Sequence, residues 1–264
     1  MSGGPGDGAA AGEAGSGTGG GAGREPTDGA APTVGVMMLD TRFPRHPRDI
    51  GQARGLPFAA LHGRVARASV ARVVRGGPPD DALLEPFAAA GIALVARGAS
   101  LLATSCGFLH PWQATLGARL PVPFVASALS LLPALEARCP GGRIGVLTFD
   151  ADAFARARTA GARTDTLLVE GLAPDGHFRA VVEGDLPRDD PARLREEVAD
   201  AARRLAVRGP VAVVLECTNL APWRAEVERE CAVPVVDVVD AVLAAAPPAV
   251  APSAVAARGP GSVR

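Results

Sequence analysis

The 264-residue sequence contains no lysine and no tyrosine. Without lysine the chain cannot form the Schiff base of a pyridoxal-phosphate enzyme, and it cannot build a P-loop that binds phosphate through a lysine amine. No apolar run approaches the ~20 residues of a membrane-spanning helix. The formal net charge is −1, without the strong basic excess of a dedicated nucleic-acid binder. We therefore expect a small-molecule substrate and neither nucleic acid nor membrane as a partner.

Cysteine is also scarce, with four residues that form no CxxC pair: Cys106, Cys139, Cys217 and Cys231. No cysteine and histidine group has zinc-site spacing, so we expect no metal. The first residues lack the charged-then-apolar pattern of a secretory signal. These observations predict free thiols in a reducing cytoplasm, and no cofactor.

Both ends of the chain are rich in small residues, and we expect disordered tails at 1–32 and 247–264. Between them, short apolar runs alternate with helical patterns. This alternation is typical of an α/β fold with mostly parallel sheets. Strands are predicted at 33–40, 99–105, 122–127, 142–149, 164–171, 210–216 and 233–237. Helices are predicted at 80–98, 111–120, 128–138, 191–209, 221–231 and 238–246.

An internal repeat divides this region into two similar halves. Sliding 97–125 onto 208–236 needs no gap and superimposes Cys106 on Cys217 and Trp112 on Trp223, the only two tryptophans. A second match, offset by 110, places 34–40 on 144–150. We therefore predict two similar lobes related by a pseudo-twofold axis, with the active site in the cleft between them. The first lobe is assigned to 33–138 together with the last helix at 238–246, and the second to 139–237.

The two repeated cysteines stand just after a predicted strand and just before a predicted helix. Ligands of parallel sheets bind at this edge, where backbone N–H groups and the helix dipole favour anions. We expect these N–H groups and the helix dipole to bind a substrate carboxylate. They should also lower the pKa of a cysteine thiol below its free value of about 8.5. One thiolate can remove a proton from one face of a carbon while the other thiol returns a proton to the opposite face. Cys106 and Cys217 are therefore the candidate catalytic residues.

Five motifs carry a resemblance to a known family: "GVMMLDTRFPR" at 35–45, "DIG" at 49–51, "TSCGF" at 104–108, "GVLTFD" at 145–150 and "LECTNLAPW" at 215–223. The sequence resembles the aspartate/glutamate racemase superfamily, which is cofactor-independent and includes hydantoin racemases. The resemblance implies two lobes with one acid/base cysteine from each, Cys106 and Cys217. It also implies that Asp40 orients or tunes a thiol. The remaining candidates for substrate binding are Thr41, Arg42, Thr104, Ser105, Gly107, Thr218 and Asn219.

Other interpretations stay open at this stage. A buried cysteine is more often a packing residue than a catalytic one, and Cys139 and Cys231, which have no repeat partners, are interpreted in that way. Arg42 and Arg45 could be solvated loop charges or clamps for an acidic substrate. A decarboxylase, a cis–trans isomerase or a non-catalytic ligand-binding protein could share this scaffold. A homo-oligomer is also compatible with the sequence.

Overall fold

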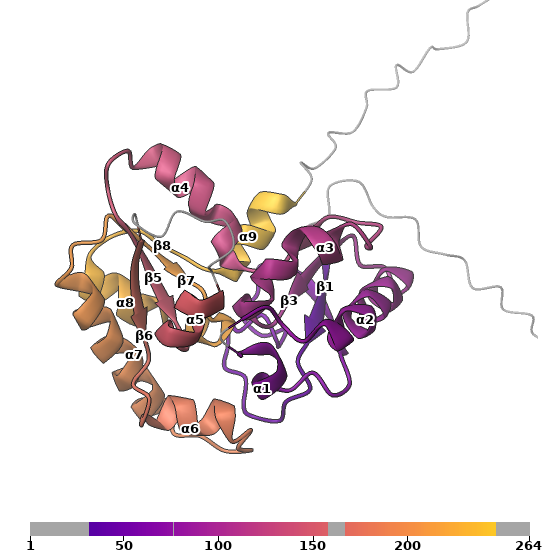
Figure 1. Ribbon diagram of the computed structural model, residues 1–264, viewed down its shortest axis with the longest axis horizontal. Helices are drawn as coiled ribbons and strands as arrows, with labels where there is room; N and C mark the ends of the chain where they lie inside the picture. Colours follow the sequence, from indigo (N-terminus) through magenta and orange to yellow (C-terminus); the bar gives the residue numbers. More distant parts are fainter. Residues whose placement is uncertain (1–31, 76, 158–166, 247–264) are drawn as a thin grey trace, which may run out of the picture. The chain divides into compact units, whose positions relative to one another are not determined.

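Two parallel four-stranded sheets form the centre of the protein (Figure 1). The computed structural model describes residues 32–75, 77–157 and 167–246. The first sheet has the order β2-β1-β3-β4, and the second has the order β6-β5-β7-β8. The strands are β1 Thr33–Met38, β2 Ala59–Arg64, β3 Leu101–Thr104, β4 Phe124–Val125, β5 Ile144–Thr148, β6 Leu167–Gly171, β7 Ala212–Leu215 and β8 Val235–Val236.

Helices and short 3-10 turns connect the strands. The α-helices are α1 Val70–Val73, α2 Leu84–Ala96, α3 Gln113–Gly117, α4 Leu132–Arg138, α5 Ala151–Ala157, α6 His177–Glu183, α7 Pro191–Ala206, α8 Arg224–Cys231 and α9 Val238–Ala245. The 3-10 helices are η1 Asp81–Leu83, η2 Gly107–Trp112, η3 Ala128–Leu131 and η4 Thr218–Trp223. The α/β class and its parallel sheets are thus confirmed.

The two sheets are built alike, as the repeat predicts. β3 and β7 differ by 111 positions, as do η2 and η4, and as do β4 and β8. In both sheets the strand that precedes a cysteine lies in the second of the two central positions. This strand is buried because it is a short run of apolar residues, with β3 and β7 buried along their whole lengths. The two cysteine turns therefore leave equivalent edges of equivalent sheets.

The last helix returns to the first sheet. Val238, Val239 and Val242 of α9 belong to one apolar cluster with Val34 of β1 and Leu101 of β3. Asp237 caps this helix, because its side chain accepts a hydrogen bond from the N–H of Val239 at 2.8 Å. α4, which occupies the corresponding place after β4, contacts β5 of the second sheet. The chain thus crosses between the lobes twice.

Four elements were not predicted: β2, α1, α5 and α6. β2 pairs with β1 only and is one of the two edge strands of its sheet, with both terminal residues exposed. It contains Ala, Gly and His in place of the β-branched residues that favour strands. The predicted tails at 1–32 and 247–264 lie outside the described residues, except for Pro32.

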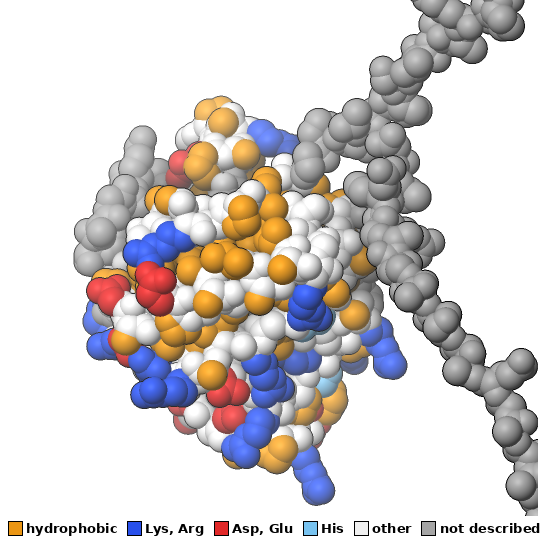
Figure 2. Space-filling model, turned by 90° about the vertical axis from the view of Figure 1, so that its right-hand side faces the viewer, with side chains coloured by type: hydrophobic (Ala, Val, Ile, Leu, Met, Phe, Trp, Pro, Cys, Tyr) orange, Lys and Arg blue, Asp and Glu red, His pale blue; other side chains and the backbone are white. Residues whose placement is uncertain are grey.

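The surface mixes charge of both signs. On the face drawn in Figure 2, hydrophobic side chains gather over the centre, and arginines lie among acidic side chains towards its lower part. No helix among the described residues is both long and apolar enough to cross a membrane.

Candidate active site

Cys106 and Cys217 line one pocket. Ser105, Thr218 and Asn219 line it beside them. The rest of the wall is mainly apolar, with side chains from both lobes: Leu39, Phe43, Val70, Val74, Phe108, Phe149 and Val182. The structure therefore brings the two repeated thiols to one small, largely apolar space.

Hydrogen bonds fix both cysteine turns. Thr104 is fully buried, and its hydroxyl donates to the carbonyl oxygens of Ala126 at 2.7 Å and Cys106 at 3.0 Å. Ser105 accepts from the backbone N–H of Leu39 at 3.1 Å. In the second lobe, Thr218 Oγ1 donates across to the carbonyl oxygen of Ser105 at 2.7 Å. The two cysteine turns therefore contact each other. The strand ends of both lobes fix the positions of the thiols.

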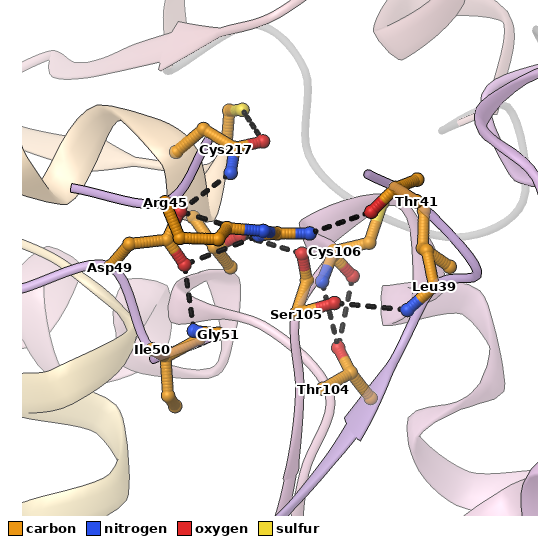
Figure 3. A network of polar contacts seen from close by, with 12 residues as sticks. Leu39, Thr41, Arg45, Asp49, Ile50, Gly51, Thr104, Ser105, Cys106 and Cys217 are labelled. Carbon is orange, nitrogen blue, oxygen red and sulfur yellow. Dashed lines mark hydrogen bonds and ion pairs between the residues drawn. The ribbon is translucent and has the colours of Figure 1, made fainter. Parts of the chain in front are cut away.

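A polar network that begins in the loop after β1 lies beside Cys217, the second thiol (Figure 3). Asp49, which is 2% exposed, accepts from the N–H of Gly51 at 2.7 Å and from Asn219 Nδ2 at 2.7 Å. Arg45 pairs with Asp49 at 3.2 Å and also donates to Thr41 Oγ1. Cys217 Sγ contacts Asn219 Oδ1 at 3.8 Å. The first lobe thus positions Asn219 beside a second-lobe cysteine.

The environment raises the pKa of both thiols. Burial is the main cause for Cys106, followed by the nearby Glu216 carboxylate, and together they raise its pKa to about 12. Burial and then Glu216 also raise the pKa of Cys217 well above its usual value. The N–H groups of Phe108 and Asn219 oppose these shifts by hydrogen bonding to the respective sulfur atoms. The predicted lowering of the thiol pKa by the helix ends is therefore wrong, because burial and one carboxylate outweigh the N–H groups.

The family model for Asp/Glu/hydantoin racemases matches residues 63–246, a stretch that includes both cysteine turns. The chain belongs to this family. Solved structures show the same fold, and arylmalonate decarboxylase matches with 21% identity and a TM-score of 0.52, covering 83% of this chain and 96% of that chain. Allantoin racemase from Klebsiella pneumoniae matches with 19% identity and a TM-score of 0.53, covering 80% of this chain and 85% of that chain. Aspartate racemase of Picrophilus torridus matches with 12% identity and a TM-score of 0.53, covering 81% of this chain and 92% of that chain.

Among characterised sequences, the chain is similar to two dimethylsulfoniopropionate lyases. The one from Durusdinium sp. clade D is 25% identical over 239 residues, covering 82% of this chain and 76% of the relative. Dimethylsulfoniopropionate lyase 2 of Emiliania huxleyi is 23% identical over 243 residues, covering 78% and 69%. The proteins that this chain resembles therefore include racemases, a decarboxylase and lyases.

The structure places the predicted site residues of this family member in three groups. Those that line the pocket are Ser105, Cys106, Gly107, Cys217, Thr218 and Asn219. Thr41 and Thr104 are buried behind the lining residues. Thr41 accepts a hydrogen bond from Arg45, and Thr104 donates one to the carbonyl oxygen of Cys106 in the first cysteine turn. Asp40 and Arg42 do not line it. The carboxylate of Asp40 accepts from the N–H of Arg67 and pairs with Arg64, while the exposed Arg42 pairs with Asp185 at 3.1 Å.

Sequence reasoning missed three charged residues of the site. Arg45, for which the sequence leaves a loop charge and a substrate clamp open, lines the pocket with a side chain that is 9% exposed. Asp49 was noted only as part of "DIG". Glu216 was read as a strand end, although it is fully buried. A carboxylate that directly follows the apolar run "VAVVL" was the available signal, because such a position is normally filled by an apolar residue.

Proposed function

We propose that the protein racemises or epimerises a small carboxylic acid, such as an amino acid, by proton transfer between Cys106 and Cys217 without a cofactor. The observation that carries this proposal is that both thiols line one pocket from repeat-equivalent turns. Inversion of a carbon needs a base on one face and an acid on the other, and an approximate twofold relation supplies that pair. Family membership supports the same class of chemistry.

The pocket walls indicate which substituent the substrate carries. Phe43, Phe108 and Phe149 contribute large apolar surfaces. The single arginine of the lining, Arg45, is already paired with Asp49. A second substrate carboxylate would lose its hydration without gaining an unpaired cation, at a high free-energy cost. The substrate we propose therefore has one carboxylate and an apolar substituent on the reacting carbon.

The proposed mechanism begins with one cysteine as thiolate. It removes the proton beside the carboxylate, and the thiol across the pocket donates a proton to the other face. The N–H groups of Phe108 and Asn219 point at the sulfur atoms and stabilise whichever thiolate forms. The reverse reaction exchanges the roles of the two thiols.

Deuterium exchange in variants tests the proposal. Enantiopure hydrophobic amino acids and 2-substituted carboxylic acids are incubated in D₂O, and NMR of the α-proton is recorded beside polarimetry. We expect Cys106→Ser and Cys217→Ser each to lower racemisation by about 10²–10⁴-fold, the usual contribution of an acid/base group. Each variant retains exchange of one enantiomer only, and the preferred enantiomer differs between the two. Racemisation by Cys217→Ser at the parent rate contradicts the mechanism.

The cysteines outside the pocket serve as matched controls. Cys139→Ser and Cys231→Ser remove thiols that do not line it, so racemisation and exchange are expected to stay at the parent rate. A comparable loss in these controls would mean that serine substitution acts through general destabilisation.

A lyase that begins with the same proton abstraction is the second candidate. Two dimethylsulfoniopropionate lyases resemble this chain, and an elimination or decarboxylation needs only one competent thiol. The unequal surroundings favour this candidate, since Cys217 is buried and Cys106 is half-buried. Release of dimethyl sulfide from dimethylsulfoniopropionate, measured by gas chromatography, identifies the lyase reaction. It should then survive in one of the two cysteine variants.

A further inference from the structure

Glu216 is a buried carboxyl group that the proposed proton transfer does not use. It lies between the end of β7 and Cys217, and it is 0% exposed. Its Oε2 accepts a 2.7 Å hydrogen bond from Thr148 Oγ1. Within the described part of the chain, Oε1 has no hydrogen-bond partner. A buried carboxylate oxygen without a partner is costly, so its retention needs a reason.

The unpartnered oxygen faces the turn of the other lobe. A Cβ placed on Gly107 would lie 2.3 Å from Glu216 Oε1 and 2.1 Å from its carbonyl oxygen. Only glycine leaves room for the Glu216 side chain there. Because Gly107 directly follows Cys106, Oε1 lies at the first cysteine turn, although Glu216 itself belongs to the second lobe.

This carboxyl group breaks the symmetry of the site. The residue that the repeat places on Glu216 is Ser105, which also directly precedes a cysteine and whose hydroxyl is occupied by the N–H of Leu39. The backbone is equivalent at both places, since Ser105 N–H donates to Met37 and Glu216 N–H donates to Leu147. Glu216 is therefore an acidic neighbour of both thiols, and the first lobe has no carboxylate at the equivalent position.

The charged groups around Glu216 leave it without a cation of its own. Arg45 is the cation that acts on Cys106, but it is bonded to Asp49 and Thr41. Asp49 acts on Cys217 with the same sign as Glu216. The ion pairs formed among the described residues do not include Glu216. Burial raises its pKa to about 7, opposed by the hydrogen bond from Thr148, so it can take up a proton near neutral pH.

We propose that Glu216 is a positioning residue whose charge controls the ionisation of Cys106, so that the buried site holds a single negative charge on either the carboxylate or the thiolate. Cys106 loses its proton, and keeps the electron pair on sulfur, once the carboxyl group has taken up a proton of its own. The neutral carboxyl then no longer repels the new thiolate. This inference rests on the proposed function for its role, but the proton coupling itself requires no substrate.

The test measures thiol ionisation in the unliganded full-length protein. Alkylation of each cysteine by iodoacetamide is followed between pH 6 and 12 by peptide mass spectrometry, and the midpoint is obtained by fitting the rate to an ionisation curve. Ionised Glu216 suppresses thiolate formation, so Glu216→Gln should move the midpoint for Cys106 to a lower pH by at least one unit. In the same variant, the pH at which α-proton exchange appears should fall by a similar amount, because the neutral amide no longer repels the thiolate. Glu170→Gln, a carboxyl outside the pocket on β6, should change neither.

These readouts separate the proton coupling from a merely structural role. Loss of packing would increase the reactivity of Cys139 and Cys231 as well and would lower the melting temperature. Thr148→Val supplies a second variant that keeps Glu216 and removes the donor to Oε2. It should raise the alkylation rate of Cys106 near neutral pH, because the carboxyl holds its proton more strongly and leaves more of the single negative charge on sulfur. An unchanged Cys106 midpoint in a folded Glu216→Gln overturns the inference, whatever the activity.

The outcome also remains distinct from that of the proposed function. If no racemisation is found but the Cys106 midpoint shifts, the coupling stands and the racemase proposal falls. If racemisation is found and the midpoint does not move, Glu216 has no part in thiol ionisation.

Discussion

Thr218 Oγ1 donates a 2.7 Å hydrogen bond to the carbonyl oxygen of Ser105, and this contact joins the two cysteine turns. The repeat places Gly107 on Thr218, and Gly107 lies against the carbonyl oxygen of Glu216. Two equivalent contacts thus join the turns in different ways. One is the hydrogen bond from Thr218, and the other is the close approach of Gly107 to the carbonyl oxygen of Glu216. Both depend on side-chain size within the site.

Thr218→Val tests the hydrogen bond. Valine preserves the shape of threonine but leaves the buried carbonyl of Ser105 without this donor, which should lower the free energy of unfolding by about 1–3 kcal/mol. Urea denaturation measures it. Thr33→Val, at the start of β1, is the control, because no hydrogen bond found among the described residues uses its hydroxyl. Equal stability of the two variants would show that this contact contributes nothing.

Gly107→Ala tests the close approach. The new Cβ would lie 2.1 Å from the Glu216 carbonyl oxygen, so backbone must move. Overpacking of this kind typically costs about 1–3 kcal/mol, and occasionally more. Gly117→Ala, in α3, is the matched control, since its nearest atom would be 3.6 Å away and alanine favours helix by up to about 1 kcal/mol. Thermal melting should separate the variants in opposite directions from the parent.

Asp49→Ala should be among the most destabilising single changes in the loop after β1. It leaves Arg45, whose side chain is 9% exposed, without its carboxylate and Asn219 Nδ2 without its acceptor. Removing one partner of a buried ion pair costs about 3–5 kcal/mol. Arg42→Ala removes an exposed ion pair from the same loop and should cost less than about 1 kcal/mol. Chemical denaturation of both variants measures the contrast, and similar losses would contradict it.

Asp185 should make stability depend on acid pH. Burial opposes its ionisation, but the N–H groups of Arg42 and Phe43 and the Arg42 guanidinium outweigh burial and lower its pKa. Its contribution is therefore complete above the unfolded value of about 3.9 and is lost as pH falls through the lower folded pKa. The stability difference between the parent and Asp185→Asn should shrink as pH drops from 6 towards 2.5. Asp175→Asn, which removes an exposed carboxyl in the turn after β6, is the control for the loss of one charge.

Periodicity and the repeat predicted most of the central fold, because buried parallel strands are apolar along their whole length. The same reasoning missed β2, an edge strand without β-branched residues, and α1, which has only four residues. Both elements are specified by what packs against them rather than by their own pattern. The helical segment predicted at 80–98 is capped by Asp80, whose side chain accepts from the N–H of Ala82.

The candidate site was predicted in part for a related reason. Cys106 and Cys217 could be found because the repeat marks them. Asp40 looked equally suitable, but its side chain turns to Arg67 and Arg64, and a strand-end position does not determine the direction of a side chain. Arg45 and Asp49 enter the site through a long loop, whose path depends on contacts with the second lobe. No local pattern in the sequence encodes such contacts.

The position of α9 bears on how the protein is made. Val238 and Val242, near the end of the described chain, cover Val34 and Leu101 of the first sheet. During synthesis the first sheet therefore emerges long before α9, the helix that covers it. Its apolar face stays uncovered while the whole second lobe is translated. We expect that nascent chains stopped before Val238 expose this face to chaperones, and that release of the last helix completes both lobes together.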